Sequence, residues 1–338
     1  MIKEAISKLV EGKNLDFTTT RRVFLEILEK RVEDFEIAAF LVALKMKGET
    51  DTEISAAASA IREKAKKIYI KEEVMDTCGT GGSGLSKFNI STTVAFVVAS
   101  SGLIKVAKHG NRGISSKCGS ADLLEKLGIN ITVSPKVTQK LLRKVGIAFL
   151  FAPLYHPAFK NVASVRRGLK IKTIFNILGP LCNPAGASYQ ILGVSHPDLV
   201  LKVAKTLRRL KTKKACIFYS EALKDEVGLS KPTYAIFLEN RKLKERVINP
   251  KEFGLRRCLP SQLKVKNAGE SARIFLEIIE GKRSPYYDVV LANSSLSFYL
   301  LGKVNNLREG VVFSEKLIKE GKVKEKFLEF KRFLENGI

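Results

Sequence analysis

From Val74 onward, short apolar runs alternate with stretches of helical periodicity, and this alternation constrains the fold more than any other feature. Runs such as VMDTC, IKVAK and YQILGV have the length of buried strands, whereas STTVAFVVASSG and HPDLVLKVAKTLRRL have the periodicity of helices. The pattern predicts an α/β fold with a mostly parallel central sheet. Further strands are expected at NITV, AFLFAP, KACIFYS, TYAIFLEN and DVVLAN, and the polar segment 240–260 is expected to be a surface excursion.

The first 70 residues have a different pattern, with helical periodicity throughout. Gly48 interrupts it, and Thr50 to Glu53 then form a capping box for the next helix. We therefore expect a small helical domain of residues 1–70, packed beside a larger α/β domain of residues 71–338.

Composition narrows the class of protein. The chain has 338 residues, of which 45% are hydrophobic, and this is enough for a large core. It has no apolar run long enough to span a bilayer, and its first residues lack the apolar centre of a signal peptide, so the cytoplasm is the expected location. Its five cysteines include no C-x-x-C pair. This spacing indicates neither a zinc site nor a disulfide framework, and we interpret the cysteines as buried space-fillers.

The formal net charge of +25 requires an explanation. Many lysines stand next to glutamates on expected helix faces, which is typical of a solvated surface. The segment between Glu125 and Asp198 is different, because it contains many lysines and arginines and no acid at all. Such a segment creates a positive field suited to an anionic substrate or to a polyanion, so nucleic-acid binding is kept as an alternative.

Glycines between Gly79 and Gly84 match G-x-G-x-x-G after an expected strand and before an expected helix. A dinucleotide-binding fold also needs an acid about 20 residues later. That place holds Lys105 to His109, which excludes the usual contact with an NAD ribose. Gly84 is followed by Leu85, so the loop is not a P-loop either. The loop alone indicates only a tight turn or a phosphate cradle.

A second polar loop supports the phosphate cradle. Asn89 and Ser91 stand at one expected helix start and Ser120 at another, so two helix N-termini are available to bind two separated phosphates. The second loop adds further donors, namely Lys108, Arg112, Ser115, Ser116 and Lys117.

Two more candidate groups lie elsewhere in the chain. Asp225 and Glu226 follow an expected strand, where adjacent carboxylates suit Mg²⁺ or simply begin a helix. Arg166 lies in the acid-free segment and can form a bidentate pair with a substrate carboxylate, or can be a solvated surface residue. His109 and His156 are interpreted as structural rather than catalytic.

Four ordered motifs resemble the anthranilate phosphoribosyltransferase family over essentially the whole chain. G-T-G-G and F-N-I-S-T occur at 79–82 and 88–92, and V-A-K-H-G-N-R occurs at 106–112. S-S-K-S-G-S-A-D is matched at 115–122 except for one position. V-R-R occurs at 165–167 and T-I-F-N-I-L-G-P-L-x-N-P at 173–184. D-E-V occurs at 225–227.

The resemblance implies transfer of the phosphoribosyl group of phosphoribosyl pyrophosphate to anthranilate, with Mg²⁺, in a homodimer that forms through the helical domain. It implies binding of Mg²⁺ by Ser91, Asp225 and Glu226, and of anthranilate by Gly79, Asn111 and Arg166. The residues implied around phosphoribosyl pyrophosphate are Gly79, Gly82, Ser83, Asn89, Ile90, Ser91, Thr92, Lys108, His109, Gly110, Asn111, Arg112, Ser115, Ser116 and Ser120.

Three positions depart from the family pattern. Ser83 replaces an aspartate, Lys87 stands where threonine is common, and Cys118 replaces a serine. Ser83 removes a carboxylate near the ribose, and Lys87 is expected to supply part of a phosphate contact instead. Two alternatives are a nucleic-acid-binding relative without transferase activity and a pyrimidine nucleoside phosphorylase of similar fold. The V-R-R and K-H-G-N-R motifs argue against both.

Overall fold

The computed structural model describes residues 1–82, 84–113 and 118–336. Its centre is one seven-stranded sheet with the order β3-β2-β1-β4-β5-β6-β7. The strands are β1 (Val74–Gly79), β2 (Lys105–Gly110), β3 (Ile147–Phe151), β4 (Tyr189–Gly193), β5 (Lys214–Ser220), β6 (Thr233–Glu239) and β7 (Lys242–Ile248).

The sheet is mostly parallel, as the sequence predicted. Strands β1 to β5 pair in parallel, and β6 and β7 add an antiparallel edge. The chain runs from β1 to β2 and β3 on one side, and then crosses to β4 on the other side of β1. This change of direction makes a topological switch point at the carboxyl ends of β1 and β4, where open α/β sheets bind ligands, and a ligand-binding crevice is expected there.

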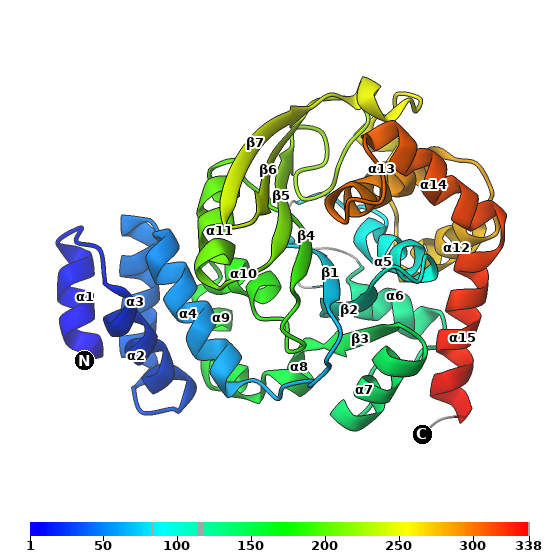
Figure 1. The fold of residues 1–338 in the computed structure, drawn as a ribbon. Coiled ribbons are helices and arrows are strands. Elements are labelled where there is room, and N and C mark those ends of the chain that lie inside the picture. Colours follow the sequence, from blue (N-terminus) through cyan, green and yellow to red (C-terminus); the bar gives the residue numbers. More distant parts are fainter. Residues whose placement is uncertain (83, 114–117, 337–338) are drawn as a thin grey trace.

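Four helices form a separate bundle at the N-terminus, at the left of Figure 1. Asp16 and Thr50 cap two of them, and the Thr50–Glu53 capping box is present as predicted. Helix α4 of the bundle packs against α11 (Asp198–Arg209), so the bundle shares its hydrophobic core with one face of the sheet. Its helices are α1 (Ile2–Val10), α2 (Phe17–Leu28), α3 (Asp34–Lys47) and α4 (Asp51–Lys64).

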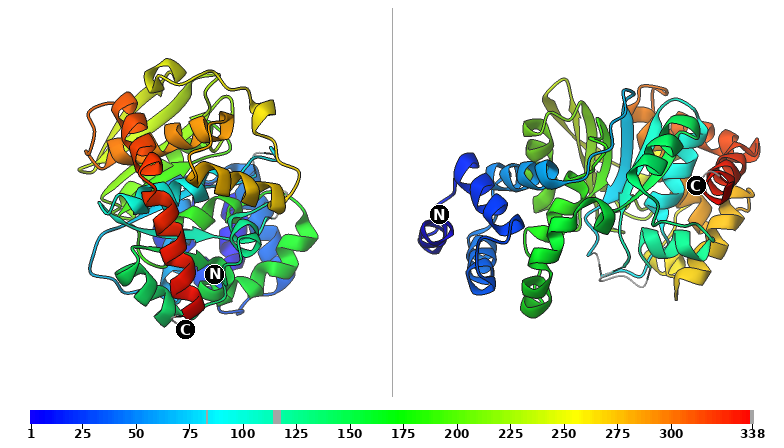
Figure 2. Two further views of the ribbon diagram at one scale, coloured as in Figure 1. Left: turned by 90° about the vertical axis from the view of Figure 1, so that its right-hand side faces the viewer. Right: turned by 90° about the horizontal axis from the view of Figure 1, so that it is seen from below.

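The remaining helices cover the two faces of the sheet. Helix α5 packs against β1 and β2, and α13 and α15 cover α5 in turn, so that α12 to α15 lie on the side away from the N-terminal bundle (Figure 2). These helices are α5 (Ile90–Ser100), α6 (Ser120–Lys126), α7 (Pro135–Lys144), α8 (Ala152–Tyr155), α9 (Ala163–Leu169), α10 (Phe175–Leu178), α11 (Asp198–Arg209), α12 (Ala268–Ile279), α13 (Pro285–Leu300), α14 (Leu307–Lys319) and α15 (Lys322–Asn336).

Three predictions of secondary structure were wrong. DVVLAN lies within α13, which is buried on nearly all sides, and a short apolar run of this kind has no period that separates strand from helix. NITV buries Ile131 and Val133 but joins no strand ladder. The supposed excursion at 240–260 contains β7, whose polar sequence is that of a solvated edge strand.

Among the described residues, no helix is both long enough and apolar enough to cross a membrane.

Candidate active site

The ends of β1 and β4 are joined by the first residue of the glycine-rich loop. Thr80 N donates to Gly193 O at 2.9 Å, and Thr80 Oγ1 accepts from Ser195 N at 3.0 Å. The loop therefore starts inside the crevice predicted by the strand order.

Two glycines allow Asp225 to lie over these strand ends. A Cβ on Gly79 would meet Asp225 Oδ2 at 2.9 Å, and a Cβ on Gly193 would meet Asp225 O at only 2.0 Å. Any other residue at position 193 must therefore move the backbone of Asp225. The need for glycine at position 193 was not recognised from the sequence, because nothing in the sequence shows that the turn after β5 crosses the end of β4.

The glycine-rich loop needs glycine for its backbone as well. Gly81, Gly82 and Gly84 have φ of 65°, 70° and 71°, in the left-handed region that other residues rarely adopt. Lys172 Nζ donates to Gly82 O at 2.7 Å and brings a cation of the acid-free segment to the loop. Lys172 was not proposed as a site residue, although its place in that segment was the signal for it.

The two adjacent carboxylates have different partners. Asp225 Oδ1 pairs with Lys87 Nζ at 2.5 Å, and Glu226 Oε1 accepts from Ser91 N at 3.2 Å, at the start of α5. Burial raises the pKa of Glu226 to about 7, with Asp225 adding to the rise and the nearby Lys87 opposing it. Lys87, which is expected to supply part of a phosphate contact, forms an ion pair with Asp225 in this structure.

Helix α5 begins where the sequence predicted, but Asn89 does not cap it. Asn89 Oδ1 accepts from Ser271 Oγ at 2.7 Å and from Cys118 Sγ at 2.8 Å. Asn89 Nδ2 donates to Cys118 O at 3.2 Å. Ile90 is fully buried, so it can offer a ligand no side chain. Thr92 is also fully buried, and its Oγ1 has no hydrogen-bond partner among the described residues.

Lys108 carries a buried cation from β2 into the site. Its Nζ donates to Thr77 O at 2.5 Å and lies 3.4 Å from Ser91 Oγ. Burial raises the pKa of Asp76 to about 6, with the charge of Lys108 opposing the rise. Because Ser91 also contacts Glu226, the start of α5 lies between Lys108 and the carboxylate pair.

The two histidines behave as structural groups. His109 N donates to Asp76 Oδ1 at 3.2 Å, and His109 Nδ1 lies 3.2 Å from Gly179 O. The His109 ring meets the His156 ring edge to face, at 5.1 Å between centroids. Burial lowers the pKa of His109 to about 3 and that of His156 to about 4, so both are neutral at pH 7.

Residues of the second loop divide between the site and the surface. Asn111 O accepts from Ser120 Oγ at 3.3 Å, and a Cβ on Gly110 would lie 2.1 Å from that hydroxyl, so the loop packs tightly on the start of α6. The Arg112 side chain is instead exposed and forms a bidentate ion pair with Glu125. Ser83, Ser115, Ser116 and Lys117 lie outside the described residues.

Arg166 on α9 is a half-buried cation with no ion pair in the described parts of the chain. Its guanidinium lies 5.3 Å from the centroid of the Phe175 ring, and burial lowers its pKa. Lys172, three residues beyond the end of α9, contacts the glycine-rich loop. The segment that carries Arg166 therefore continues to the crevice.

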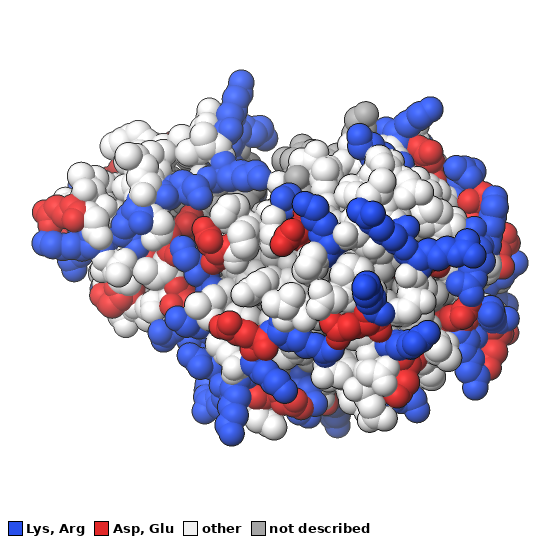
Figure 3. All heavy atoms as spheres, turned by 90° about the horizontal axis from the view of Figure 1, so that it is seen from above, with Lys and Arg blue, Asp and Glu red and all other residues white. Residues whose placement is uncertain are grey.

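Outside the crevice, the positive charge is dispersed. Figure 3 shows Lys and Arg spread over one face of the molecule with acids between them. Many of the cations are paired, for example Lys213 with Glu73 at 2.7 Å and Lys324 with Glu280 at 3.0 Å.

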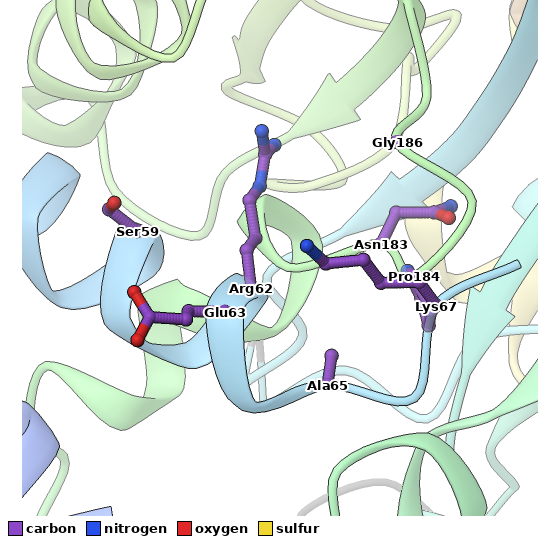
Figure 4. A pocket seen from close by; sticks show the side chains of 8 residues that line it. All are labelled: Ser59, Arg62, Glu63, Ala65, Lys67, Asn183, Pro184 and Gly186. Atoms are coloured by element: carbon purple, nitrogen blue, oxygen red, sulfur yellow. The ribbon is translucent and has the colours of Figure 1, made fainter. Parts of the chain in front are cut away.

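A cavity of about 390 Å³ lies apart from the predicted site residues, at the junction of α4 with the loop that follows Leu181 (Figure 4). Arg62 Nε crosses this junction to Leu181 O at 2.6 Å. The residues that line the cavity are Ser59, Arg62, Glu63, Ala65, Lys67, Asn183, Pro184 and Gly186.

Comparison with protein families first defines the class. The model of the glycosyl transferase family a/b domain matches residues 71–324, and that of the family's helical bundle domain matches residues 3–65. The chain is therefore a glycosyl transferase built from these two units.

Individual relatives define the family within that class. The anthranilate phosphoribosyltransferase of Petrotoga mobilis is 43% identical to this chain, over 99% of this chain and 98% of its own length. That of Persephonella marina is 42% identical, over the full length of both chains. The crystal structure of the Thermus thermophilus enzyme has a TM-score of 0.91 at 34% identity, and covers 98% of this chain and 99% of its own. The Saccharomyces cerevisiae enzyme in complex with phosphoribosyl pyrophosphate and Mg has a TM-score of 0.90 at 27% identity, covering 99% and 98%. This chain belongs to the anthranilate phosphoribosyltransferase family.

Proposed function

We propose that the protein transfers the phosphoribosyl group of phosphoribosyl pyrophosphate to the amine of anthranilate. The products are N-(5-phosphoribosyl)anthranilate and pyrophosphate, in a step of tryptophan biosynthesis. The observation that carries the proposal is the meeting of the glycine-rich loop, Lys108 and the Asp225–Glu226 pair at the start of α5.

Phosphoribosyl pyrophosphate is proposed to bind in the crevice between β1 and β4. The glycine-rich loop and the start of α5 offer backbone N–H groups and hydroxyls, and Lys108 supplies positive charge. The residues proposed around this substrate are those that the family resemblance implied, with Lys172 added. The contribution of Ile90 is limited to its backbone, and Arg112 is held at the surface by its ion pair with Glu125.

Anthranilate is proposed to bind through its carboxylate to Arg166, with Asn111 and Gly79 close by. A half-buried guanidinium without an ion-pair partner among the described residues favours an anionic ligand. The centroid of the Phe175 ring lies 5.3 Å from the guanidinium carbon, and the ring packs beside it.

The chemistry requires positioning more than acid–base catalysis. The bond from C1 of the ribose to the pyrophosphate oxygen breaks, and pyrophosphate keeps the electron pair. The lone pair of the anthranilate nitrogen then forms the new C1–N bond, and the nitrogen releases one proton to solvent. An aromatic amine is unprotonated at pH 7, so no strong base is needed, in keeping with neutral, buried His109 and His156.

Asp225, Glu226 and the Ser91 hydroxyl are the proposed ligands of Mg²⁺. When bound, the ion neutralises the charge that develops on the leaving pyrophosphate. The described residues contain no group of three or more candidate ligands, but Mg²⁺ is commonly held by one or two carboxylates together with water and substrate phosphates. The donor set therefore fits a metal that arrives with its substrate.

Three broader features remain predictions. We expect a homodimer, because Val10, Phe35 and Met46 expose large apolar side chains on the helical bundle. We expect the cytoplasm as its compartment, since all five cysteines are buried and unpaired. We place the boundary between the helical domain and the α/β domain after residue 70. Nucleic acid is kept only as the alternative partner that the net charge of +25 raises.

Loss of anthranilate fluorescence tests the proposal. We expect this loss to require both phosphoribosyl pyrophosphate and Mg²⁺. We expect no transfer to aniline, which lacks the carboxylate assigned to Arg166. Absence of turnover between 25 and 80 °C would contradict the proposed function.

A further inference from the structure

The pair of Lys87 and Asp225 lies at the carboxylates proposed for Mg²⁺. Lys87 Nζ is 2.5 Å from Asp225 Oδ1 and 2.7 Å from Leu223 O. Each side chain of the pair exposes 10% of its surface. An ammonium therefore already occupies one binding direction of this carboxylate, in a partly desolvated place where charge pairs interact more strongly than in water.

The backbone of Lys87 is held independently of this pair. Phe88 N donates to Leu263 O at 3.3 Å, and Val265 N donates to Ser86 O at 3.0 Å, so Lys87 faces Lys264 in a short antiparallel bridge. The backbone of Lys87 is thus hydrogen-bonded to a second segment of the chain, and its side chain extends from there to Asp225.

The ammonium also retains capacity for a ligand. It has three donors, and the contacts with Asp225 and Leu223 occupy two of them. A third N–H and the positive charge remain for an anion that enters the crevice. The threonine that is common at this position in the family offers neither.

We propose that the Lys87 ammonium competes with a divalent cation for Asp225, so that a metal ion binds this carboxylate only weakly while Lys87 is paired with it. The proposal rests on the proposed function for its catalytic meaning, because it concerns the carboxylates assigned to Mg²⁺. It predicts weak metal binding in the absence of substrate.

The test is a titration with MnCl2 alone, followed by electron paramagnetic resonance of the free ion and by calorimetry. The variant Lys87→Thr should bind Mn²⁺ at least about tenfold more tightly than the wild type, because it frees Asp225. The double variant Lys87→Thr with Asp225→Asn should lose that gain. The matched control is Lys264→Thr, which removes an exposed cation from the partner segment and should stay within about twofold of wild type. Equal affinities in Lys87→Thr and wild type would overturn the proposal.

A second measurement does not depend on the folding of Lys87→Thr. Because Lys87 already engages Asp225, the single variant Asp225→Asn should leave Mn²⁺ affinity within about twofold of wild type. A tenfold loss would show that Asp225 binds the metal in the absence of substrate despite its pair with Lys87, and would overturn the proposal.

The parallel anthranilate assay separates the two proposals. An active enzyme whose Mn²⁺ affinity does not respond to Lys87→Thr overturns the role of Lys87 and leaves the proposed function standing. An inactive protein whose Mn²⁺ affinity rises as expected overturns the function and supports the role of Lys87.

Discussion

The Cys118 thiol donates to Asn89 Oδ1 across 2.8 Å and so ties the second polar loop to the start of α5. Burial raises the pKa of this thiol to about 11, so it remains protonated, and a donor, at neutral pH. A serine hydroxyl at this position can donate the same hydrogen bond.

Replacing Cys118 tests this link. Cys118→Ser should keep the KM for phosphoribosyl pyrophosphate within about twofold, whereas Cys118→Ala should raise it about fivefold, since one neutral hydrogen bond contributes about 1 kcal/mol. Steady-state kinetics measure both. Cys258→Ala is the control, because it removes another buried thiol outside the site. Equal KM values for the serine and alanine variants would contradict the role of the thiol.

Arg166→Ala should raise the KM for anthranilate by roughly 10- to 100-fold with little change in kcat, because a charge-assisted bidentate pair contributes about 1.5–3 kcal/mol. The control is Arg167→Ala, which removes the exposed neighbouring cation. If the two variants have the same KM, Arg166 does not bind the carboxylate.

Gly193→Ala should reduce turnover at least about 100-fold while the protein remains folded, because the added Cβ would stand 2.0 Å from Asp225 O and must displace that turn. Gly168→Ala is the control, since a Cβ there meets nothing within 4 Å. Turnover and circular dichroism are measured together. A folded Gly193→Ala variant with wild-type turnover would show that the position of Asp225 is not critical.

His156 should make stability depend on pH. Burial lowers its pKa from 6.5 to about 4, so the unfolded chain binds the extra proton between these values, and stability is lost as pH falls through that window. At pH 5 this effect lowers the free energy of unfolding by about 2 kcal/mol. Asp76 and Glu226 have raised pKa values and act in the opposite direction, but they are common to wild type and variant.

Urea unfolding of wild type and His156→Phe at pH 7 and pH 5 isolates this effect. Phenylalanine keeps the stacking on Phe159 and cannot be protonated, so the variant should lose less stability on acidification than wild type. The exposed His196→Gln serves as the control. An identical loss in wild type and His156→Phe would contradict the buried neutral imidazole.

The sequence predicted the sheet, the helical bundle and the start of α5, because each depends on local periodicity and capping. It could not predict α13 from DVVLAN, since burial on all sides removes the period. The contact of Lys87 with Asp225 joins residues 138 positions apart, and only the crossing of the chain at β4 brings them together. The same crossing explains why the need for glycine at 193 was missed.

The central claim is that this crevice transfers a phosphoribosyl group to anthranilate. The most direct measurement follows anthranilate consumption and pyrophosphate release together, in wild type and in the double variant Asp225→Ala with Glu226→Ala. The account predicts equal amounts of both in wild type and the loss of Mg²⁺-dependent turnover in the double variant. Pyrophosphate release without anthranilate consumption, or wild-type turnover in the double variant, would contradict it.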